Sequence, residues 1–457
     1  MQPFEVQLDQ IIENQRRFFN TNQTKDISFR KNALKRFHDE IVAHETEINQ
    51  AIKSDLHKSL EESYLTEISL VLGDIKYHIK KLNSWAKPQR IGTPLHVLPS
   101  KTRLLHEPLG VSLIMAPWNY PFQLLMNSLV GALSSGCCAI LKPAPETPET
   151  VKVIKKIVAK AFKPEHVTLI EPTLEENEIV LRKRYDFIFF TGSPRVGRIV
   201  AEAAAKHLTP VVLELGGKSP CIVDEHANIE ITAKRIVFGK LINCGQTCIA
   251  PDYIYAHQSI KGKLIEAIKK TIVEMYGENC KEVAHYPRMI HARATERVSG
   301  LIDPSKVVFG GEFDIEGRYI SPTILDNVTT DDAVMQEEIF GPLFPILSYS
   351  NIDDVVSYIK SNEKPLAFYY FGKEKAGMDV FHQTSSGGGC INDTLMHITN
   401  NKVPFGGVGN SGMGGYHGYY SFEAFSNKRA IVITPTWIDL PLKYAPFKYF
   451  NLIKKIM

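Results

Sequence analysis

Apolar side chains recur at helical spacing through residues 4–87. The first stripe is formed by Phe4, Leu8, Ile11 and Ile12, with charged residues on the opposite face. The ranges 34–52 and 65–82 repeat the pattern. Such stripes predict amphipathic helices that bury one face against a core. These helices are expected to serve packing and to carry no chemistry of their own.

The pattern changes over residues 88–105. Pro94 and Pro99 interrupt it, the apolar side chains alternate loosely, and the ends are basic. A β-hairpin or an extended arm leaving the domain is the expected structure. Near the C-terminus, residues 428–434 alternate basic and apolar side chains as an edge strand does. The arm and this strand could pair across a subunit boundary.

From Gly110 onward, short apolar runs alternate with amphipathic segments. The runs that predict strands are 111–115, 137–141, 167–170, 187–190 and 211–213. The segments that predict helices begin at 121 and span 147–162 and 196–206. Thr147 is suited to cap the second of these helices, and Pro148 is suited to its first turn. The alternation predicts a parallel, doubly wound sheet with helices on both faces, whose ligands bind beyond the carboxyl ends of the strands.

The alternation restarts after Gly216-Gly217. Further strands are predicted at 221–223, 253–256, 367–371 and 390–392. Further helices are predicted at 229–242, 260–276, 353–359 and 374–384. We therefore expect a second α/β domain, with the Gly-Gly pair as the joint between the two.

One run without charges, residues 122–141, has about the length of a membrane span. It contains Gln123, Asn127 and three serines, and Gly136 splits it. This polar content favours a buried helix followed by a buried strand over a span.

Composition narrows the class of protein. The chain has 457 residues, 44% hydrophobic and 23% charged, as is typical of soluble globular proteins of two or three domains. A formal net charge of +3 gives no reason to expect nucleic acid as a partner. Seven thinly spread cysteines without zinc spacing predict free thiols and no metal site. Residues 1–10 do not resemble a secretory signal, so a reducing, cytoplasmic setting is expected.

A candidate anion site follows the strand 187–190. The chain runs through Gly192 and Ser193 into a helix that Ser193 can cap. A helix N-terminus after a glycine turn presents free N–H groups to a phosphate. The spacing from Gly192 to Gly197 is G-x-x-x-x-G and not the dinucleotide fingerprint, so an ordinary strand-to-helix turn fits equally well.

Four more candidates lie at strand ends or at the domain joint. Lys142 leaves the second predicted strand, where it can meet a ribose, although a surface lysine is the alternative. Asn119 lies in a loop stiffened by two prolines and can donate to an oxyanion, or can simply serve the turn. Glu214 follows the fifth strand, where desolvation would raise its pKa toward that of a general base. Cys248 follows a helix-patterned run that breaks at Gly245, so it is either a nucleophile held at a turn or a buried thiol.

Six short motifs occur in the order of one known family. They are Pro117-Trp118-Asn119, Phe190-Thr191-Gly192-Ser193, Glu214-Leu215-Gly216-Gly217-Lys218, Gly245-Gln246-Thr247-Cys248, Glu337-Glu338-Ile339-Phe340-Gly341-Pro342 and Pro404-Phe405-Gly406-Gly407. On these motifs the chain resembles the NAD(P)-dependent aldehyde dehydrogenase family over nearly its whole length. The short lead before Asn119 and the closing residues 416–426 are most similar to the class 3 branch, which acts on fatty or aromatic aldehydes.

The resemblance implies a role for each candidate. The catalytic residues would be Cys248 as nucleophile, Glu214 as general base, and Asn119, whose amide forms the oxyanion hole with the Cys248 N–H. Lys142 would bind the adenosine ribose of the cofactor, and Gly192 and Ser193 would approach its pyrophosphate. Glu338 would hold the nicotinamide ribose, with Phe340 beside it. Trp118 and Gly197 would complete the cofactor site. The thiolate would form a thiohemiacetal, hydride would pass to NAD(P), and water activated by Glu214 would hydrolyse the thioester.

The resemblance also gives the domains their functions. The fold would comprise two doubly wound α/β domains, a Rossmann-like cofactor domain and a catalytic domain, with a small β oligomerisation arm. The predicted division is 1–87 and 106–214 for the dinucleotide-binding domain, 215–420 for the catalytic thiol domain, 88–105 and 421–440 for the bridging strands, and 441–457 for the tail. A homodimer is implied. The basic, aromatic tail is too short to span a bilayer. It is expected to dock on the surface of the protein, and contact with a membrane or with a partner subunit is the alternative.

Two positions depart from the family pattern. Many NAD-preferring members carry a glutamate three residues after the lysine, but Pro145 stands there and Glu146 follows it. We therefore predict use of both NAD and NADP. Cys244 lies four residues before Cys248, one helical turn away if the helix continues. It could form a protective disulfide under oxidation or remain an inert buried thiol.

Three functions stay open on the sequence alone. The first is oxidation of an aldehyde to the free acid, with Tyr120 and Ile242 lining an entrance that would favour an apolar chain or ring. The second is a related enzyme in which coenzyme A or phosphate takes the acyl group, as in a semialdehyde-phosphate dehydrogenase. The third is a structural or binding protein without activity. Glu214 favours hydrolysis, and an intact set of Cys248, Asn119 and Glu214 argues against the third.

Overall fold

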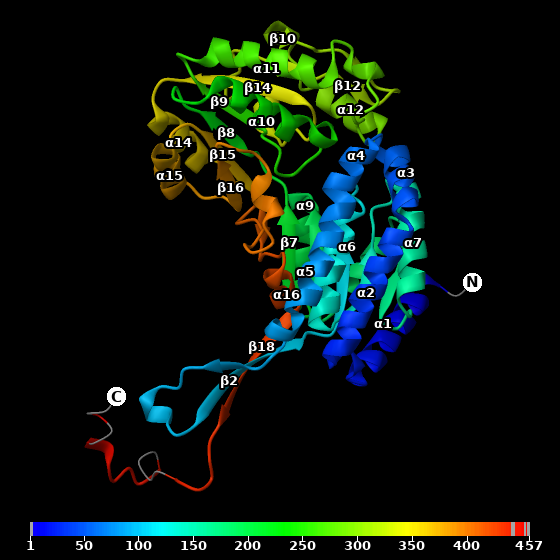
Figure 1. Cartoon of the computed structure of the whole chain (residues 1–457), viewed down its shortest axis with the longest axis vertical. Coiled ribbons are helices and arrows are strands. Elements are labelled where there is room, and N and C mark those ends of the chain that lie inside the picture. The colour runs from blue at the N-terminus through cyan, green and yellow to red at the C-terminus, as the bar shows by residue number, and fades with distance from the viewer. Residues whose placement is uncertain (1–2, 440–443, 452–453, 455–457) are drawn as a thin grey trace.

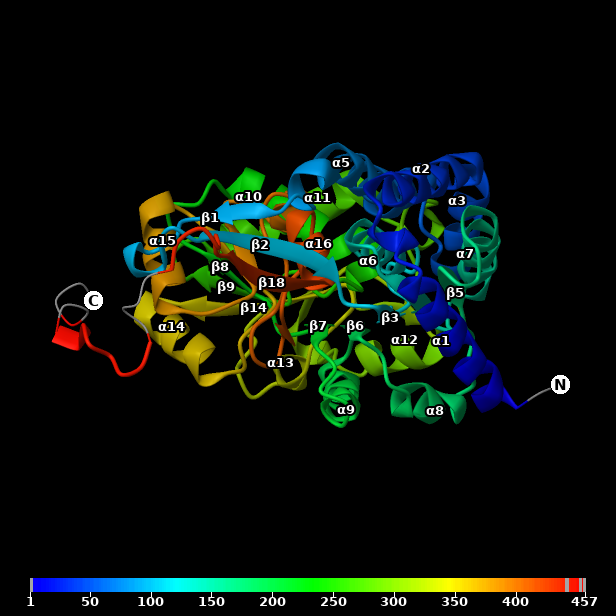
Figure 2. The same cartoon turned by 90° about the horizontal axis from the view of Figure 1, so that it is seen from below.

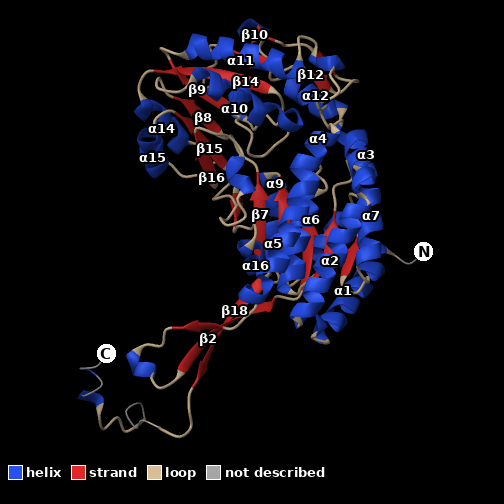
Figure 3. Ribbon diagram, viewed as in Figure 1, coloured by secondary structure: helices blue, strands red, loops and turns tan. Residues whose placement is uncertain are grey.

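The computed structural model describes residues 3–439, 444–451 and 454, and the chain forms two α/β units and a projecting arm (Figures 1 and 3). The first unit opens with α1 (Phe4–Asn20), α2 (Ile27–Ala43) and α3 (Glu45–Leu56). A short α4 (Leu60–Ser63) continues through the π-helical segment η2 (Tyr64–Ile68) into α5 (Ser69–Trp85). The helical prediction for 4–87 is confirmed, although the range 34–52 is two helices that meet at His44.

The first unit contains the predicted parallel sheet. Its strands are β3 (Val111–Met115), β4 (Cys138–Lys142), β5 (Val167–Leu169), β6 (Phe187–Gly192) and β7 (Val211–Leu215). The strand order is β7-β6-β3-β4-β5. From β3 the chain adds β4 and β5 on one side and then returns to add β6 and β7 on the other, so the switch point lies between β3 and β6. Ligands of such sheets bind beyond the carboxyl ends at this point.

Helices cover both faces of this sheet. They are α6 (Gln123–Ser135) and α7 (Pro148–Ala161) with α2 and α5 on one face, and α8 (Glu176–Arg182) and α9 (Pro194–Ala205) with α1 on the other. In β6, Phe187 and Phe189 enter one core, whereas Ile188 and Phe190 enter the other. Continuous apolar runs are what a strand buried on both faces requires.

The uncharged run 122–141 is the buried helix α6 followed by the buried strand β4, as expected. Every residue of α6 is buried, and its serine hydroxyls donate to carbonyls of the preceding turn. This bonding satisfies polar groups inside a core. None of the helices in the described part of the chain has the length and apolarity that a membrane crossing needs.

The second unit is built on a sheet of order β10-β13-β14-β9-β8-β15-β16. Its strands are β8 (Pro220–Val223), β9 (Tyr253–His257), β10 (Val307–Phe309), β13 (Thr323–Leu325), β14 (Leu343–Tyr349), β15 (Ala367–Phe371) and β16 (Gly388–Ile391). The helices around it are α10 (Ile229–Leu241), α11 (Lys261–Tyr276), α12 (Ala292–Ser299), α14 (Ile352–Ser361) and α15 (Glu374–Gln383). All pairs are parallel except β10 with β13, so the prediction of a second α/β unit is confirmed.

The arm is a three-stranded antiparallel sheet that projects from the body (Figures 1 and 2). It consists of β1 (Gln89–Ile91), β2 (Lys101–Pro108) and β18 (Ser426–Ile433), in the order β1-β2-β18. The expected hairpin is therefore present, and β18 pairs with β2 of the same chain. The predicted tail, 441–457, is described at residues 444–451 and 454, and its other residues lie outside the described part of the chain.

The chain returns to the first sheet before residue 420. The short strand β17 (Gly412–Met413) pairs antiparallel with β7, and Gly412 lies opposite Glu214. The helix α16 (Tyr419–Ala424) then packs against α6. Residues 412–413, which were assigned to the catalytic domain, thus pair with the sheet of the cofactor domain. The division at residue 420 stays a prediction.

The predicted cap of α7 is wrong. Pro148 does occupy the first helical turn, but the Thr147 hydroxyl is buried and accepts no hydrogen bond from the helix. Asp55, at the end of α3, caps α7 instead: its carboxylate accepts from the Thr150 N–H at 2.8 Å and from the Thr150 hydroxyl at 2.7 Å. A carboxylate from a neighbouring helix can satisfy first-turn N–H groups as well as a local side chain can.

Asp55→Ala is therefore expected to destabilise the protein by about 1–3 kcal/mol, because it leaves buried donors of α7 unpaired. Thr147→Val is the matched control. It keeps the side-chain shape and removes a hydroxyl that has no partner, so stability should stay unchanged or rise by about 1 kcal/mol. Thermal unfolding of the two variants compares them. Equal losses would contradict this assignment of the cap.

Candidate active site

The turn that carries Cys248 is not a continuation of α10. The helix ends at Leu241, and a short turn, η4 (Ile242–Gly245), follows. Asn243 and Cys244 have φ of 52° and 55°, and Gly245 has φ of 74°. A Cβ at Gly245 would lie 2.3 Å from the Gly341 carbonyl oxygen, so only glycine fits there. Cys244 is therefore not one helical turn from Cys248, and the premise of that prediction is wrong.

Amide side chains hold this turn against the loop after β3. The Asn119 Nδ2 donates to the Gln246 carbonyl at 3.0 Å, and Asn243 Nδ2 donates to the Asn119 carbonyl at 2.7 Å. Gln246 in turn donates to the Arg288 carbonyl and accepts from the Ile290 N–H at 2.9 Å. Asn119 and Cys248, predicted to act together, thus lie on two loops bonded directly to one another.

The Asn119 amide keeps one donor for a ligand. An amide NH2 group has two N–H donors, and the Gln246 carbonyl takes one of them. The Oδ1 atom has no hydrogen-bond partner, although the residue is buried. The second N–H has no partner among the described residues, and Asn119 lies behind the Cys248 turn and not in the described wall of its cavity.

The Cys248 thiol is partly exposed and faces a cavity. Burial raises its pKa well above that of a free thiol, and the carboxyl groups of Glu338 and Glu214 add to the rise. The N–H groups of Cys248 and Ile249 act in the opposite direction. The thiol is thus protonated until a ligand or a base changes its surroundings.

Glu214 lies at the end of β7 and lines the same cavity as Cys248. Its side chain is buried, and both carboxyl oxygens lack a hydrogen-bond partner. Burial alone raises its pKa well above the usual range of a glutamate. Such a group keeps its proton to a higher pH than an exposed glutamate does, and it is a stronger base once it has lost that proton.

Cys244 differs from Cys248. It is fully buried, its Sγ contacts the Tyr286 hydroxyl at 3.7 Å, and burial raises its pKa to about 12. These surroundings favour the inert thiol over a reactive one.

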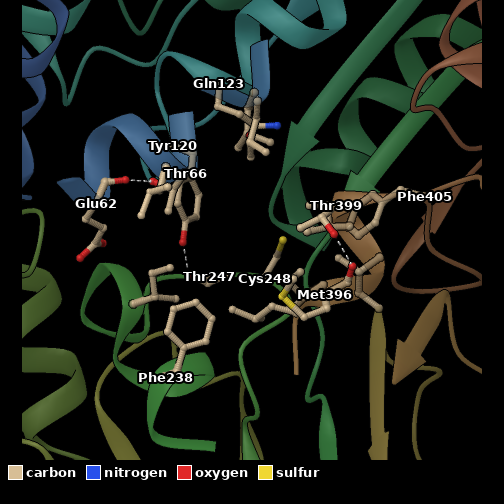
Figure 4. Close-up of a pocket in the computed structure, with 18 of the residues that line it drawn as sticks. Glu62, Thr66, Tyr120, Gln123, Phe238, Thr247, Cys248, Met396, Thr399 and Phe405 are labelled. Atoms are coloured by element: carbon tan, nitrogen blue, oxygen red, sulfur yellow. Dashed lines mark hydrogen bonds between the residues drawn. The ribbon is translucent and has the colours of Figure 1, made fainter. Parts of the chain in front are cut away.

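The cavity at Cys248 has a volume of about 730 Å³ and a mostly apolar wall (Figure 4). Both entrance residues expected from the sequence, Tyr120 and Ile242, line it. The Tyr120 hydroxyl and the Thr247 Oγ1 lie 2.6 Å apart. The charged or titratable residues of the described wall are Glu61, Glu62, Glu214, Cys248, His285 and the three tyrosines at 120, 276 and 416, and none is lysine or arginine.

The predicted phosphate-binding residues meet at the switch point of the first sheet. Gly192 ends β6 beside Leu215 of β7, and the Ser193 hydroxyl accepts from the Val196 N–H at 3.4 Å as the cap of α9. Gly197 faces Leu215 so closely that a Cβ there would lie 2.6 Å from a methyl group. The N-terminus of α9 therefore points its free N–H groups to the edge where a dinucleotide binds.

Lys142 ends β4 at the same edge and is half-buried. Burial lowers the pKa of its ammonium, and the nearby Glu146 carboxylate partly offsets that fall. Among the described residues, none forms a hydrogen bond or an ion pair with the Lys142 ammonium, although the Lys142 carbonyl accepts from the Ala116 N–H. Its ammonium is thus available to a ligand.

Trp118 and Phe340 face each other across the two units. Their ring centroids lie 5.6 Å apart at 89°, and both line a second cavity of about 390 Å³. Glu338 lies close by, with an oxygen 2.2 Å from where a Cβ on Gly216 would be. Burial, with the Asp252 carboxylate, raises the pKa of Glu338 to about 8.

Sequence reasoning missed the side chains that hold the Glu338 segment. Arg297, on α12, donates to the Ile339 carbonyl at 2.6 Å and to the Glu337 carboxylate at 2.9 Å. Asp252 accepts from the Ile339 N–H at 3.0 Å and pairs with Lys218. Lys218 belongs to a recognised motif, whereas Arg297 and Asp252 lie in segments without a distinctive pattern, so no local signal could have found them.

The sequence model of the aldehyde dehydrogenase family matches residues 4–431. The chain belongs to the aldehyde dehydrogenase family. Aldehyde dehydrogenases oxidise aldehydes with NAD(P), so the chain is an oxidoreductase with this activity and cofactor. The resemblance found in its motifs is thereby confirmed.

Several relatives are similar over nearly the whole chain. A 4,4'-diaponeurosporen-aldehyde dehydrogenase from Staphylococcus aureus is 46% identical over 98% of both chains. Aldehyde dehydrogenase family 3 member A2 from Macaca fascicularis is 41% identical over 93% of this chain and 88% of its own length. A dimeric NADP-preferring aldehyde dehydrogenase from Canis lupus familiaris is 40% identical over 95% and 96%. The expected likeness to the class 3 branch is confirmed.

A solved substrate-bound structure of AldH from Staphylococcus aureus shares the fold. Its TM-score is 0.96, with 45% identity over 98% of this chain and 99% of that one. The residues of this aldehyde dehydrogenase fit a dinucleotide: the α9 N-terminus, the available Lys142 ammonium and the cradle at Gly216 border one edge. No group of three or more His, Cys, Asp and Glu side chains suited to a metal ion occurs in the described ranges.

Proposed function

We propose that this enzyme oxidises apolar aldehydes, aliphatic of medium or long chain or aromatic, to free carboxylic acids, with Cys248 as the nucleophile. The observation that carries the proposal is the cavity itself. One apolar chamber contains the Cys248 thiol and the Glu214 carboxyl, with the Asn119 amide bonded to the Cys248 turn. A nucleophile, a base and an oxyanion donor are the groups that acyl chemistry requires.

The steps follow from these groups. The Cys248 thiol gives its proton to solvent, the resulting thiolate attacks the aldehyde carbon, and the carbonyl oxygen becomes an oxyanion that the free N–H of Asn119 and the Cys248 N–H stabilise. The bound nicotinamide supplies the acceptor for the hydride that leaves this carbon. Glu214 in its carboxylate form then takes a proton from water, the hydroxide attacks the resulting thioester, and the acid leaves while the released thiolate takes up the proton from Glu214.

The cofactor contacts are proposed as the sequence suggested them. Lys142 holds the adenosine ribose, Gly192 and Ser193 approach the pyrophosphate with Gly197 and Trp118 beside them, and Glu338 holds the nicotinamide ribose next to Phe340. The α9 N-terminus supports the pyrophosphate site, because its N–H groups and dipole favour an anion.

We predict that NAD and NADP give kcat/KM values within about tenfold of each other, a difference of about 1.4 kcal/mol. The Lys142 ammonium can pair with a 2′-phosphate. Glu146, whose carboxylate raises the pKa of Lys142, is exposed and stands one position after the place of the glutamate in NAD-preferring members. Initial rates with each cofactor check this. A preference above about a hundredfold would contradict it.

The substrate class rests on the composition of the wall. The described wall has carboxyl groups and no lysine or arginine, so an aldehyde with its own carboxylate or phosphate finds no cation to pair with. The diaponeurosporen-aldehyde dehydrogenase relative is named for a long apolar substrate, which supports the same class.

A panel of aldehydes tests the proposal. Decanal is expected to exceed an ω-carboxylated aldehyde of the same length by about 10²-fold in kcat/KM, because the second carboxylate would be desolvated unpaired. Product analysis with and without coenzyme A or phosphate forms the second arm. Formation of an acyl-coenzyme A or acyl phosphate would favour the alternative function, an acylating or semialdehyde-phosphate dehydrogenase on the same fold.

We also propose a cytoplasmic homodimer. The named dimeric relative supports the dimer, and the exposed arm strand β18, with Val432 and Ile433 about half-exposed, is a surface on which a second subunit could pair. Light scattering at several concentrations tests the dimer. A monomeric mass at micromolar concentration would contradict it.

A further inference from the structure

A buried ion pair outside the cavity holds the loop that carries Asn119. Lys58 and Glu67 are both fully buried, and their Nζ and Oε1 atoms lie 2.7 Å apart. Lys58 precedes α4, and Glu67 lies in the π-helical segment η2. Taking two charges out of water is costly unless their other hydrogen-bonding positions are also satisfied. Those positions are satisfied by one short stretch of chain.

The partners of both charges are residues 119–123. Lys58 Nζ donates to the Asn119 carbonyl at 3.1 Å and lies 4.0 Å from the centroid of the Tyr120 ring. Glu67 Oε2 accepts from the N–H groups of Phe122 at 2.9 Å and Gln123 at 3.3 Å. These N–H groups open α6, whose own N-terminal side chain gives it no cap. The pair therefore holds the Asn119 loop at its carbonyl and again at the start of the next helix.

The π-helical segment gives the pair its position. A π-turn contains one more residue than a regular turn, and such turns occur frequently at functional sites. Leu65 and Thr66 of this segment line the substrate cavity, whereas Glu67 is buried and bonded to the Asn119 loop. Figure 4 shows Thr66 on the same side of the cavity as Tyr120. One segment thus contacts both the substrate space and the loop that ends at α6.

We propose that Lys58 and Glu67 are positioning residues for the oxyanion step and act through Asn119. This inference rests on the proposed function, in which the Asn119 amide binds the oxyanion. The amide can keep one N–H on the Gln246 carbonyl and direct the other at substrate only while its backbone stays fixed. Small displacements of such a donor cost much of its effect, because the donor must meet the oxygen as charge develops. Neither side chain of the pair lines the described wall of the cavity.

A double-mutant cycle separates positioning from mere stabilisation of the fold. Lys58→Met with Glu67→Gln removes both charges together, and the glutamine oxygen can still accept from the α6 N–H groups. This variant is expected to lower kcat by about 10- to 100-fold with little change in the KM for the cofactor. In an Asn119→Ala background the same pair of changes should lower kcat less than about twofold, because the residue it acts through is gone. The control is Arg16→Met, which removes an ion pair to Asp186 beside the amino end of β6 and should leave kcat unchanged in both backgrounds.

A second variant covers the case in which the double variant does not fold. Glu67→Asp keeps both charges of the buried pair and shortens the acceptor side chain by one methylene. Its loss of kcat should likewise be much smaller in the Asn119→Ala background. The inference is overturned if a folded variant keeps wild-type kcat, if its loss adds fully to that of Asn119→Ala, or if neither variant folds, since the pair would then serve the fold. Wild-type activity of Asn119→Ala alone would instead refute the oxyanion role in the proposed function.

Discussion

Cys248→Ala is expected to lower kcat for aldehyde oxidation by at least about 10⁴-fold. No other described thiol can replace it, because Cys248 is the one cysteine of the described wall and the nearby Cys244 thiol is fully buried against Tyr286. The loss should appear in kcat with the cofactor still bound, since the substituted side chain is proposed to touch substrate and not the dinucleotide. Initial rates and cofactor binding, followed by fluorescence of the reduced cofactor, separate the two.

Cys390→Ala is the matched control, because Cys390 is the other partly exposed thiol of the described chain. It contacts the His397 ring at 3.5 Å and does not line the wall of the Cys248 cavity. Its kcat should stay within about twofold of the wild type. Full activity of Cys248→Ala, or loss in Cys390→Ala alone, would place the nucleophile elsewhere.

Strands that are apolar throughout were predictable, whereas β14, which has a proline in its interior, was not. The run Phe187–Phe190 is apolar throughout because alternate side chains enter two cores. The strand β14 was missed since Pro345 argues against a central strand. In the structure Pro345 lies opposite Leu325 of β13, and the pairing of β14 with β9 begins one residue later, at Ile346, so the proline stands where β14 passes from one neighbour to the other.

The candidate site was predictable where its residues form continuous motifs. Asn119, Glu214 and Cys248 each follow a strand or helix whose pattern is clear, and they converge in one cavity or on loops bonded to it. The residues that support them could not be found in this way. Lys58 and Asp55 act on partners 61 and 95 residues away, and in the sequence they resemble ordinary charges of an exposed helical surface. Only the fold brings a buried charge to its distant partner.

Glu214→Gln is expected to separate the two halves of the reaction. The amide keeps the size of the side chain but cannot take a proton from water, so the thioester should form and then hydrolyse slowly. The steady-state kcat should fall by about 10³-fold, while rapid mixing shows a burst of reduced cofactor close to one equivalent per active site. Intact-protein mass spectrometry of the quenched reaction should detect the acyl group on Cys248.

The raised pKa of Glu214 determines how kcat should change with pH. Burial raises the pKa of Glu214, so its basic form, the form that deacylation needs, increases as pH rises. Wild-type kcat should therefore increase as pH rises through the raised pKa of Glu214, and Glu214→Gln should lose that part of the increase. Glu202→Gln, an exposed position on α9, is the control and should keep the wild-type profile. A Glu214→Gln enzyme without a burst would mean that Glu214 acts before the thioester forms, and a variant rescued by coenzyme A would show that the thioester has an acceptor other than water.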